Sequence, residues 1–346
     1  MASPPVSATD SSARVITQHR VWIPLVIMGT IIGATFIAVY VGIQRVPAPH
    51  KLPVAVAGEQ LSTAMDAGLG EAVNLIRVSG AEEGTHQVRN GDAVAVVYAI
   101  SPTTLQLDYA GASGLSESGA SRQLVAGFAS KADFAVLETD IVPLSQYDAR
   151  GLAAFYVVFG VTLSSFVLAQ GLSAATTSVR LRHRIYAMFG FAVVIGLVAA
   201  TIAGSLYRSL PAPFPQLAVS LILLSAASAF ATKALGAWLG PAGIGVAVLL
   251  LTTVGNATSG ATIGYHLLPG WARAISAELP PGAAVRAVND FAYYNGSHAM
   301  SSLLVLGLWI VIGLGLVLLR RRTAERHPAE TSNELGLRTE APSITG

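Results

Sequence analysis

Long uncharged apolar stretches alternate with polar segments along this chain, and their positions predict where it crosses a membrane. No Asp, Glu, Lys, Arg or His occurs from Val21 to Ile43. A helix of that length spans about 34 Å, enough to cross a hydrocarbon core of about 30 Å. It exceeds the roughly 7–15 apolar residues of a signal peptide, so we expect a retained anchor. Five further apolar stretches follow in the second half, at Gly151–Ser173, Ile185–Tyr207, Phe214–Gly236, Ala237–Ser259 and Ala299–Leu319.

Arginine clusters in the short flanking segments predict the orientation of these six spans. Cytoplasmic loops carry an excess of Lys and Arg. Six spans place three clusters on one side: Arg14 with Arg20, then Arg180, Arg182 and Arg184, then Arg320 to Arg322. We therefore expect a multi-pass protein of a bacterial plasma membrane with both termini in the cytoplasm. Lys233, near one end of the fourth span, is expected to reach the headgroups as an interface anchor.

The polar segment between the first two spans, residues 44–150, has the pattern of a small folded domain. After a proline-rich stalk, short runs with strand character alternate with helical ones. The predicted strands are Val54–Ala57, Val73–Val78, Ala93–Ile100, Thr104–Tyr109 and Phe134–Val142, and the predicted helices are Glu59–Leu69, Glu82–Arg89 and Ser121–Lys131. This alternation predicts an extracytoplasmic α/β domain with one sheet. Its mildly acidic charge indicates an ordinary solvated surface.

A second atypical segment, Gly260–His298, separates the fifth and sixth spans. Prolines at Leu267–Pro269 and Leu279–Gly282 interrupt any continuous helix, and Trp271, Phe291, Tyr293 and Tyr294 are typical of a membrane interface. We expect short helices that lie in, or dip into, the outer leaflet. Outside the five-helix bundle of residues 151–319, residues 1–20 are predicted to be a cytoplasmic arm and residues 320–346 a disordered cytoplasmic tail. The predicted fold class is an α-helical polytopic membrane protein, with six transmembrane helices in a 1+5 arrangement and the α/β domain between the first two.

Composition narrows the function mainly by exclusion. Hydrophobic residues make up 53% of the chain and charged residues 12%, half the share of about 25% in soluble proteins. A net charge of +2 gives no reason to expect nucleic-acid binding. Cysteine is absent, the seven histidines are scattered and predicted to be single surface residues, and no phosphate-binding loop or hydrolase motif occurs. The sequence thus predicts no enzyme, no cofactor and no metal site. Membrane lipid is the expected partner around the spans.

Two features of the predicted bundle leave alternatives open. Small residues recur at Ser225–Ala229, and glycines at 236, 240, 243 and 245. They indicate close helix packing within the bundle, or else a subunit interface or movable surface. The loop Ala174–Arg184 carries three arginines that topology alone explains. The same arginines would suit docking of a separate ATPase, which needs a rigid cytoplasmic element to transmit force.

Three segments add a pattern through their order and spacing. Pro49–Gly58 reads PHKLPVAVAG after the first span, and Val142–Leu152 reads VPLSQYDARGL before the second. The third segment runs through Leu268-Pro269-Gly270-Trp271, Leu279-Pro280-Pro281-Gly282 and Tyr293-Tyr294-Asn295-Gly296 before the last span. Over roughly residues 20–320 this order resembles the type-2 ABC exporter permeases, particularly the branch that includes the YhgE/Pip (phage infection protein) membrane proteins.

The resemblance implies a half-transporter that forms a homodimer and is powered by a separate cytoplasmic ATPase subunit. It would export a drug, lipid or envelope precursor. Arg180, Arg182 and Arg184 are the candidate ATPase-coupling loop. The candidate outer-mouth re-entrant segment comprises Pro269, Trp271, Pro280, Pro281, Gly282, Tyr293 and Tyr294. The alternative is a cell-envelope scaffold or phage-receptor-like surface protein of the YhgE/Pip type that transports nothing.

Overall fold

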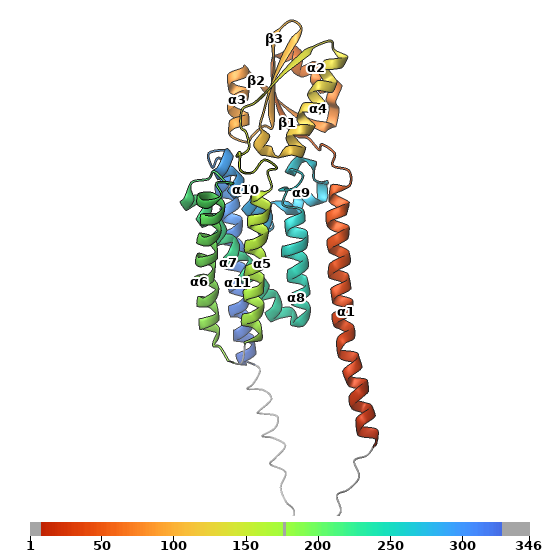
Figure 1. The fold of residues 1–346 in the computed structure, drawn as a ribbon, viewed down its shortest axis with the longest axis vertical. Coiled ribbons are helices and arrows are strands. Elements are labelled where there is room, and N and C mark those ends of the chain that lie inside the picture. The colour runs from red at the N-terminus through yellow and green to blue at the C-terminus, as the bar shows by residue number, and fades with distance from the viewer. Residues whose placement is uncertain (1–7, 176–177, 327–346) are drawn as a thin grey trace, which may run out of the picture.

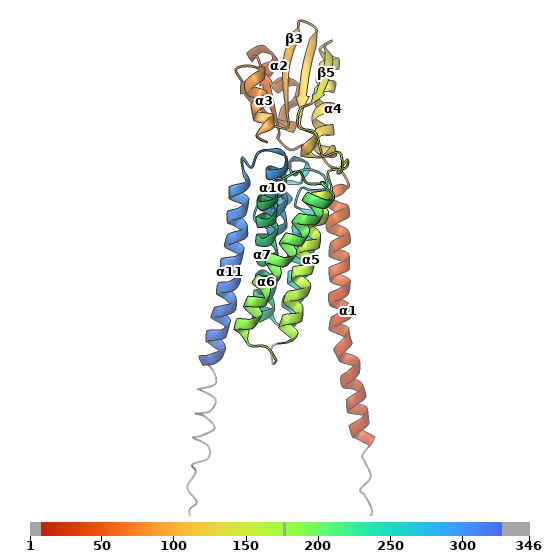
Figure 2. The ribbon, with the colours of Figure 1, turned by 60° about the vertical axis from the view of Figure 1, so that its left-hand side comes forward.

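The computed structural model describes residues 8–175 and 178–326, which form a helical bundle with a small sheet domain at one end (Figure 1). We call residues 52–140 the sheet domain and residues 153–326 the bundle. The first helix, α1 (Ala8–Gln44), runs beside the bundle toward the sheet domain. The start of α1 and the end of α11 (Ala299–Arg326) both lie away from the sheet domain (Figure 2). We call that end of the bundle the distal end, and the boundary with the sheet domain the junction.

The sheet domain contains strands and helices close to the predicted residues. Its strands are β1 (Leu52–Ala57), β2 (Val73–Val78), β3 (Ala95–Ser101), β4 (Thr104–Tyr109) and β5 (Ala135–Asp140). Its helices are α2 (Glu59–Leu69), α3 (Ala81–Arg89) and α4 (Leu115–Lys131), with 3₁₀ turns η1 (Gly70–Ala72) and η2 (Gly111–Ser113). The strands form one sheet in the order β2-β1-β3-β4-β5, antiparallel only between β3 and β4. The predicted α/β domain with a single sheet is confirmed.

Alternation of side chains along β1 explains how helices cover both faces of this sheet. Val54 and Val56 are buried on one face with Met65 of α2, in a cluster to which α4 also contributes. Ala55, between them, is buried on the opposite face with Val88 of α3. A strand covered on both faces requires this continuous apolar run. The sheet domain therefore has three layers, with α2 and α4 on one side and α3 on the other.

The bundle consists of long helices and a group of short ones near the junction. The long helices are α5 (Ala153–Ala174), α6 (Leu181–Ala200), α7 (Phe214–Leu239) and α11. The π-helical segment η3 (Thr201–Leu206) continues α6, and α8 (Pro241–Ala247) continues into the π-helical η4 (Val248–Gly255). The short elements are η5 (Tyr265–Leu267), α9 (Gly270–Ser276) and α10 (Pro280–Tyr293).

Helix α7 is the central helix of the bundle, and its small residues explain why. Ser225–Ala229 is buried throughout, where α7 packs against α5, α6, α10 and α11. A Cβ added at Gly196 of α6 would lie 2.8 Å from the backbone nitrogen of Ile222. One added at Gly313 of α11 would lie 2.9 Å from the carbonyl carbon of Phe230. At Ser225–Ala229 the small residues thus let neighbouring helices of one chain approach closely, which is the simpler of the two predicted roles. An added Cβ at Gly236 or Gly240, by contrast, would meet nothing within 4 Å.

The structure differs from the prediction at the expected fifth span, Ala237–Ser259. Among the described residues, five helices are long and apolar enough to cross a membrane: Trp22–Gln44, Ala153–Ala174, Leu181–Leu206, Phe214–Leu239 and Ala299–Arg322. The remaining stretch forms only the shorter apolar helix Pro241–Gly255, about 22 Å long at the usual helical rise. It starts late because Gly240, with a positive φ of 58°, ends α7 and reverses the chain.

The two chain ends also depart from the predicted boundaries. Helix α1 already begins at Ala8, within the predicted N-terminal arm, and α11 continues to Arg326, beyond the predicted start of the tail at residue 320. The rest of the predicted arm and tail, residues 1–7 and 327–346, lies outside the described residues.

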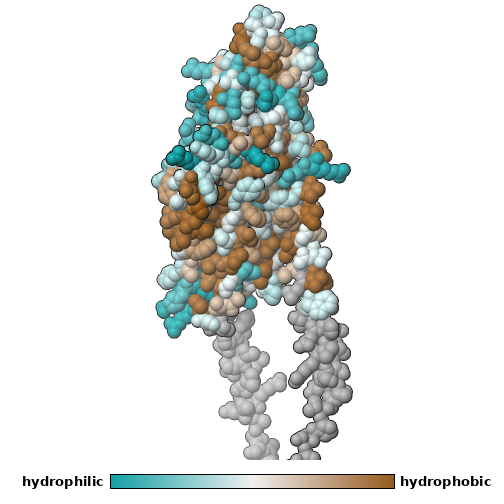
Figure 3. Space-filling view, viewed as in Figure 1, coloured by the Kyte–Doolittle hydropathy of each residue, from teal (hydrophilic) through white to brown (hydrophobic). Residues whose placement is uncertain are grey.

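The surface of the bundle is apolar where that of the sheet domain is polar. Figure 3 shows hydrophobic residues gathered over the bundle, below a largely hydrophilic sheet domain. Large apolar side chains such as Val194, Leu304 and Val311 are exposed on its outside. Monomeric soluble proteins rarely expose so large an apolar surface, whereas lipid would cover it. Together with the long apolar helices, this surface defines a membrane-embedded protein that carries a small sheet domain.

Candidate functional site

The predicted outer-mouth segment lies at the junction, and only its central part, Pro280 to Gly282, is fully buried. Pro269 precedes the first turn of α9, and Trp271 in that turn is 54% exposed. Pro280 and Pro281 are the first two residues of α10, where a proline's fixed φ and missing N–H are tolerated. Both prolines and Gly282 are buried, and α10 packs against α5, α7, α11 and η4. Unlike a helix that lies in the outer leaflet, α10 thus packs inside the bundle.

Gly282 is required by close packing and not by an unusual turn. A Cβ at this position would lie 1.9 Å from the carbonyl oxygen of Ser276, the last residue of α9. On the other side, Pro281 packs against Gly255 at the end of η4, where an added Cβ would lie 2.9 Å from the proline Cγ. The start of α10 is therefore wedged between α9 and η4.

Tyr293 and Tyr294 connect the end of α10 to the sheet domain. Both belong to the apolar cluster that covers the α3 face of the sheet. The backbone N–H of Ser145 donates a hydrogen bond to the Tyr293 hydroxyl at 3.4 Å. An added Cβ at Gly91, after α3, would lie 3.1 Å from the Tyr294 ring. These two aromatic residues thus pack against the sheet domain.

Two histidines of the bundle pair with acidic residues of the sheet domain across the junction. The His266 ring contacts the carboxylate of Glu117, which is only 4% exposed. The Nε2 of His298 lies 3.0 Å from a carboxylate oxygen of Asp92. The prediction that these histidines are single residues is therefore wrong, although His298 is exposed at the surface as expected. No local pattern could have shown the pairs, because the partners are 149 and 206 residues apart.

A cavity of about 260 Å³ lies between these two pairs and is lined by charged and polar groups of α10. Arg286, Asn289 and Asp290 of α10 face it, together with His298. Burial raises the pKa of Asp290 to about 6, although the charges of His298 and Arg286 oppose the shift. Burial lowers the pKa of Arg286, whose guanidinium also lies 3.4 Å from the Ser276 carbonyl oxygen. Within the described residues, no group of three His, Asp or Glu could hold a metal ion here.

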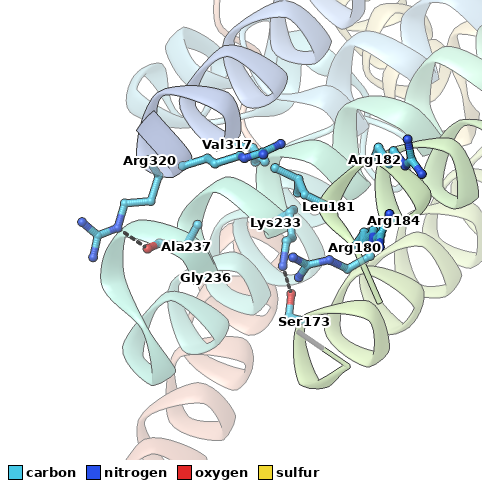
Figure 4. A pocket seen from close by; sticks show the side chains of 11 residues that line it. Ser173, Arg180, Leu181, Arg182, Arg184, Lys233, Gly236, Ala237, Val317 and Arg320 are labelled. Carbon is cyan, nitrogen blue, oxygen red and sulfur yellow. Dashed lines mark hydrogen bonds between the residues drawn. The ribbon is translucent and has the colours of Figure 1, made fainter. Parts of the chain in front are cut away.

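At the distal end, a larger hollow of about 750 Å³ contains the predicted coupling arginines (Figure 4). We call it the distal pocket. It is lined by Ser173, Arg180, Leu181, Arg182, Arg184, Lys233, Gly236, Ala237, Val317, Arg320 and Arg321. These come from the end of α5, the start of α6, and the distal ends of α7 and α11. Two of the three arginine clusters that the sequence separates, at residues 180–184 and 320–321, are therefore adjacent here.

The structure separates the three predicted coupling arginines into two kinds. Arg180 and Arg182 are exposed at the start of α6. Arg184 is buried and donates a hydrogen bond from Nη1 to the carbonyl oxygen of Leu172 at 3.4 Å. Lys233 is also buried, and its Nζ donates to the Ser173 hydroxyl at 3.1 Å. The side chain of Lys233 thus lies in a pocket at the distal end of the bundle, and its predicted role as an interface anchor stays a prediction.

The fold and these two sites define a membrane-embedded protein with a docked sheet domain and a strongly basic distal end. No protein-family model, curated protein or solved structure matches this chain.

Proposed function

We propose that this chain is the membrane-spanning subunit of an exporter that a separate cytoplasmic ATPase powers. The single observation that carries the proposal is the position of Arg180 and Arg182. They are exposed at the start of α6, on the distal end and away from the sheet domain. An ATPase bound there would act on the end of a long helix and not on a flexible loop.

Helix α6 offers a continuous path from these arginines to the junction. It packs along α7, continues through the π-helical η3, and ends near Arg208. There the Ser145 hydroxyl, just before α5, donates a hydrogen bond to the Arg208 carbonyl oxygen at 2.9 Å. Coupling between distant sites needs such packed elements. Because π-helical turns often mark functional sites, η3 is the proposed hinge.

We further propose that the chain crosses the membrane six times and has its distal end in the cytoplasm. Pro241–Gly255 starts beside the distal end of α7 and ends against Pro281 at the junction, so it returns the chain to the junction side despite its shortness. The three arginine-rich segments favour a cytoplasmic distal end. The sheet domain would then face outward. The plasma membrane, the homodimer and a drug, lipid or envelope precursor as cargo rest on the resemblance alone.

Purification from the cells that naturally express the chain tests this proposal. We expect a P-loop ATPase to co-purify in mild detergent, and to be lost from the Arg180→Gln, Arg182→Gln variant. A matched control, Arg45→Gln with Arg150→Gln, removes two exposed arginines near the sheet-domain end and should retain the ATPase. A correctly inserted wild-type chain that never brings down an ATPase would contradict the proposal. It would favour the envelope scaffold or phage-receptor-like alternative.

A further inference from the structure

The distal pocket contains two buried cations that have no carboxylate partner among the residues the structure describes. Arg184 and Lys233 are each only 7% exposed. No Asp or Glu lines the pocket, and neither cation takes part in an ion pair within residues 8–175 and 178–326. Moving a charge out of water is costly unless an opposite charge and hydrogen bonds replace the lost solvation. Two such charges in one pocket therefore require an anion or water from outside this part of the chain.

The protein supplies only part of the hydrogen bonding that these two side chains need. Lys233 has three donors, of which one reaches Ser173. Arg184 has five donors and reaches the Leu172 carbonyl oxygen, whereas its buried Nε has no hydrogen-bond partner among the described residues. Figure 4 shows Arg184 and Lys233 on adjacent helices around the pocket. Unsatisfied donors on both sides favour a ligand with several acceptor oxygens.

We propose that the distal pocket binds a phosphate group, with Arg184 and Lys233 as its inner contacts. Two oxygens of a phosphate can accept parallel hydrogen bonds from the planar guanidinium of an arginine, and the lysine ammonium neutralises a second negative charge. Arg180 and Arg182 add positive charge at the rim of the same pocket. Its volume of about 750 Å³ leaves room for more than the phosphate itself. The site does not depend on whether the chain is an exporter.

The location of the pocket makes the headgroup of an anionic phospholipid the expected source of that phosphate. The pocket lies at the ends of α7 and α11, two of the helices apolar enough to span a membrane. Leu181 and Val317 provide apolar lining beside the cations, suitable for the first part of an acyl chain. Basic pockets between membrane helices bind lipid headgroups in this way. A free phosphate or a soluble phosphoester would have the same recognition chemistry.

Binding to the purified full-length chain tests the proposal, with three probes in parallel. The first is nanodiscs of phosphatidylglycerol with phosphatidylcholine, the second nanodiscs of phosphatidylcholine alone, and the third inorganic phosphate. Retained lipid is measured by native mass spectrometry and stabilisation by thermal unfolding. We expect Arg184→Gln with Lys233→Gln to weaken phosphatidylglycerol binding at least tenfold. The matched control is Arg322→Gln, an exposed arginine at the same end that does not line the pocket.

The outcomes separate the possible sources and the failure of the idea. A lipid site is supported if phosphatidylglycerol stabilises the wild type, inorganic phosphate does not, and the double variant loses the stabilisation. Stabilisation by phosphate alone, lost in the same variant, supports a soluble phosphoester. Equal binding by wild type and double variant, or no binding of either probe, would overturn the proposal. The single variants answer the same question if the double variant does not fold, because each removes one inner contact.

Discussion

Gly282→Ala is the substitution that most sharply tests the packing at the junction. The added Cβ would lie 1.9 Å from the Ser276 carbonyl oxygen, whereas real Cβ contacts essentially never fall below 3.0 Å. Helices α9 and α10 would have to separate by about 1 Å, and such overpacking costs about 1–3 kcal/mol. The neighbouring contact is backbone, so no side-chain rotation relieves it. Alanine's helix propensity returns at most about 1 kcal/mol.

Thermal unfolding in detergent measures this cost, and Gly270→Ala is its matched control. Gly270 begins α9 in the same segment, and an added Cβ there meets nothing within 4 Å. We expect the melting temperature of Gly282→Ala to fall by a few degrees, since one kcal/mol corresponds to about 2–4 °C for a unit of about 150–250 residues, such as the bundle. Gly270→Ala should leave it unchanged or slightly raised. Equal melting temperatures for the two variants would refute the close approach of α9 and α10.

Three further predictions address topology, pH dependence and the proline break. The chain has no natural cysteine, so single cysteines can be introduced: Ser116→Cys should react with a membrane-impermeant reagent in intact cells, whereas Ser178→Cys should not. The reverse labelling would overturn a cytoplasmic distal end. Folding raises the pKa of Asp290 from 3.8 to about 6, so the folded state is stabilised below this pH range and loses that stabilisation as pH rises through it. Between pH 7 and pH 5, the free energy of unfolding should therefore increase by about 1 kcal/mol more in wild type than in Asp290→Asn, and equal increases would exclude the shift. Pro280→Ala with Pro281→Ala should retain expression but impair export or phage adsorption, by allowing α9 and α10 to fuse, and full activity would mark the break as an ordinary turn.

Much of the fold could be predicted because local pattern determines it. The strands of the sheet domain are short runs that are either continuously apolar or alternating, and all five begin within two residues of their predicted starts. The long helices likewise follow from their uncharged length. The shortened helix Pro241–Gly255 was not predicted, because the whole stretch Ala237–Ser259 carries no charged residue. The backbone reversal at Gly240 shortens it, and a window of average hydropathy does not detect a reversal.

The candidate sites were harder to predict because they depend on contacts between distant segments. The sequence does not show that Arg184 is buried while Arg180 and Arg182 are exposed. That difference arises because Arg180 precedes the first turn of α6 and Arg182 lies on another face of the helix than Arg184, which points toward α5. Similarly, Asp290 acquires its raised pKa only when the sheet domain and the end of α10 enclose it.

ATP hydrolysis by the complex purified from native membranes tests the central claim most directly. The chain itself contains no phosphate-binding loop, so hydrolysis would have to come from a bound partner. The account predicts measurable hydrolysis that co-purifies with wild type and with the Arg45→Gln, Arg150→Gln control. It also predicts that hydrolysis is lost when Arg180→Gln and Arg182→Gln are combined. Hydrolysis at the same rate from all three preparations would contradict coupling through α6, and its absence from wild type would contradict an ATP-driven exporter.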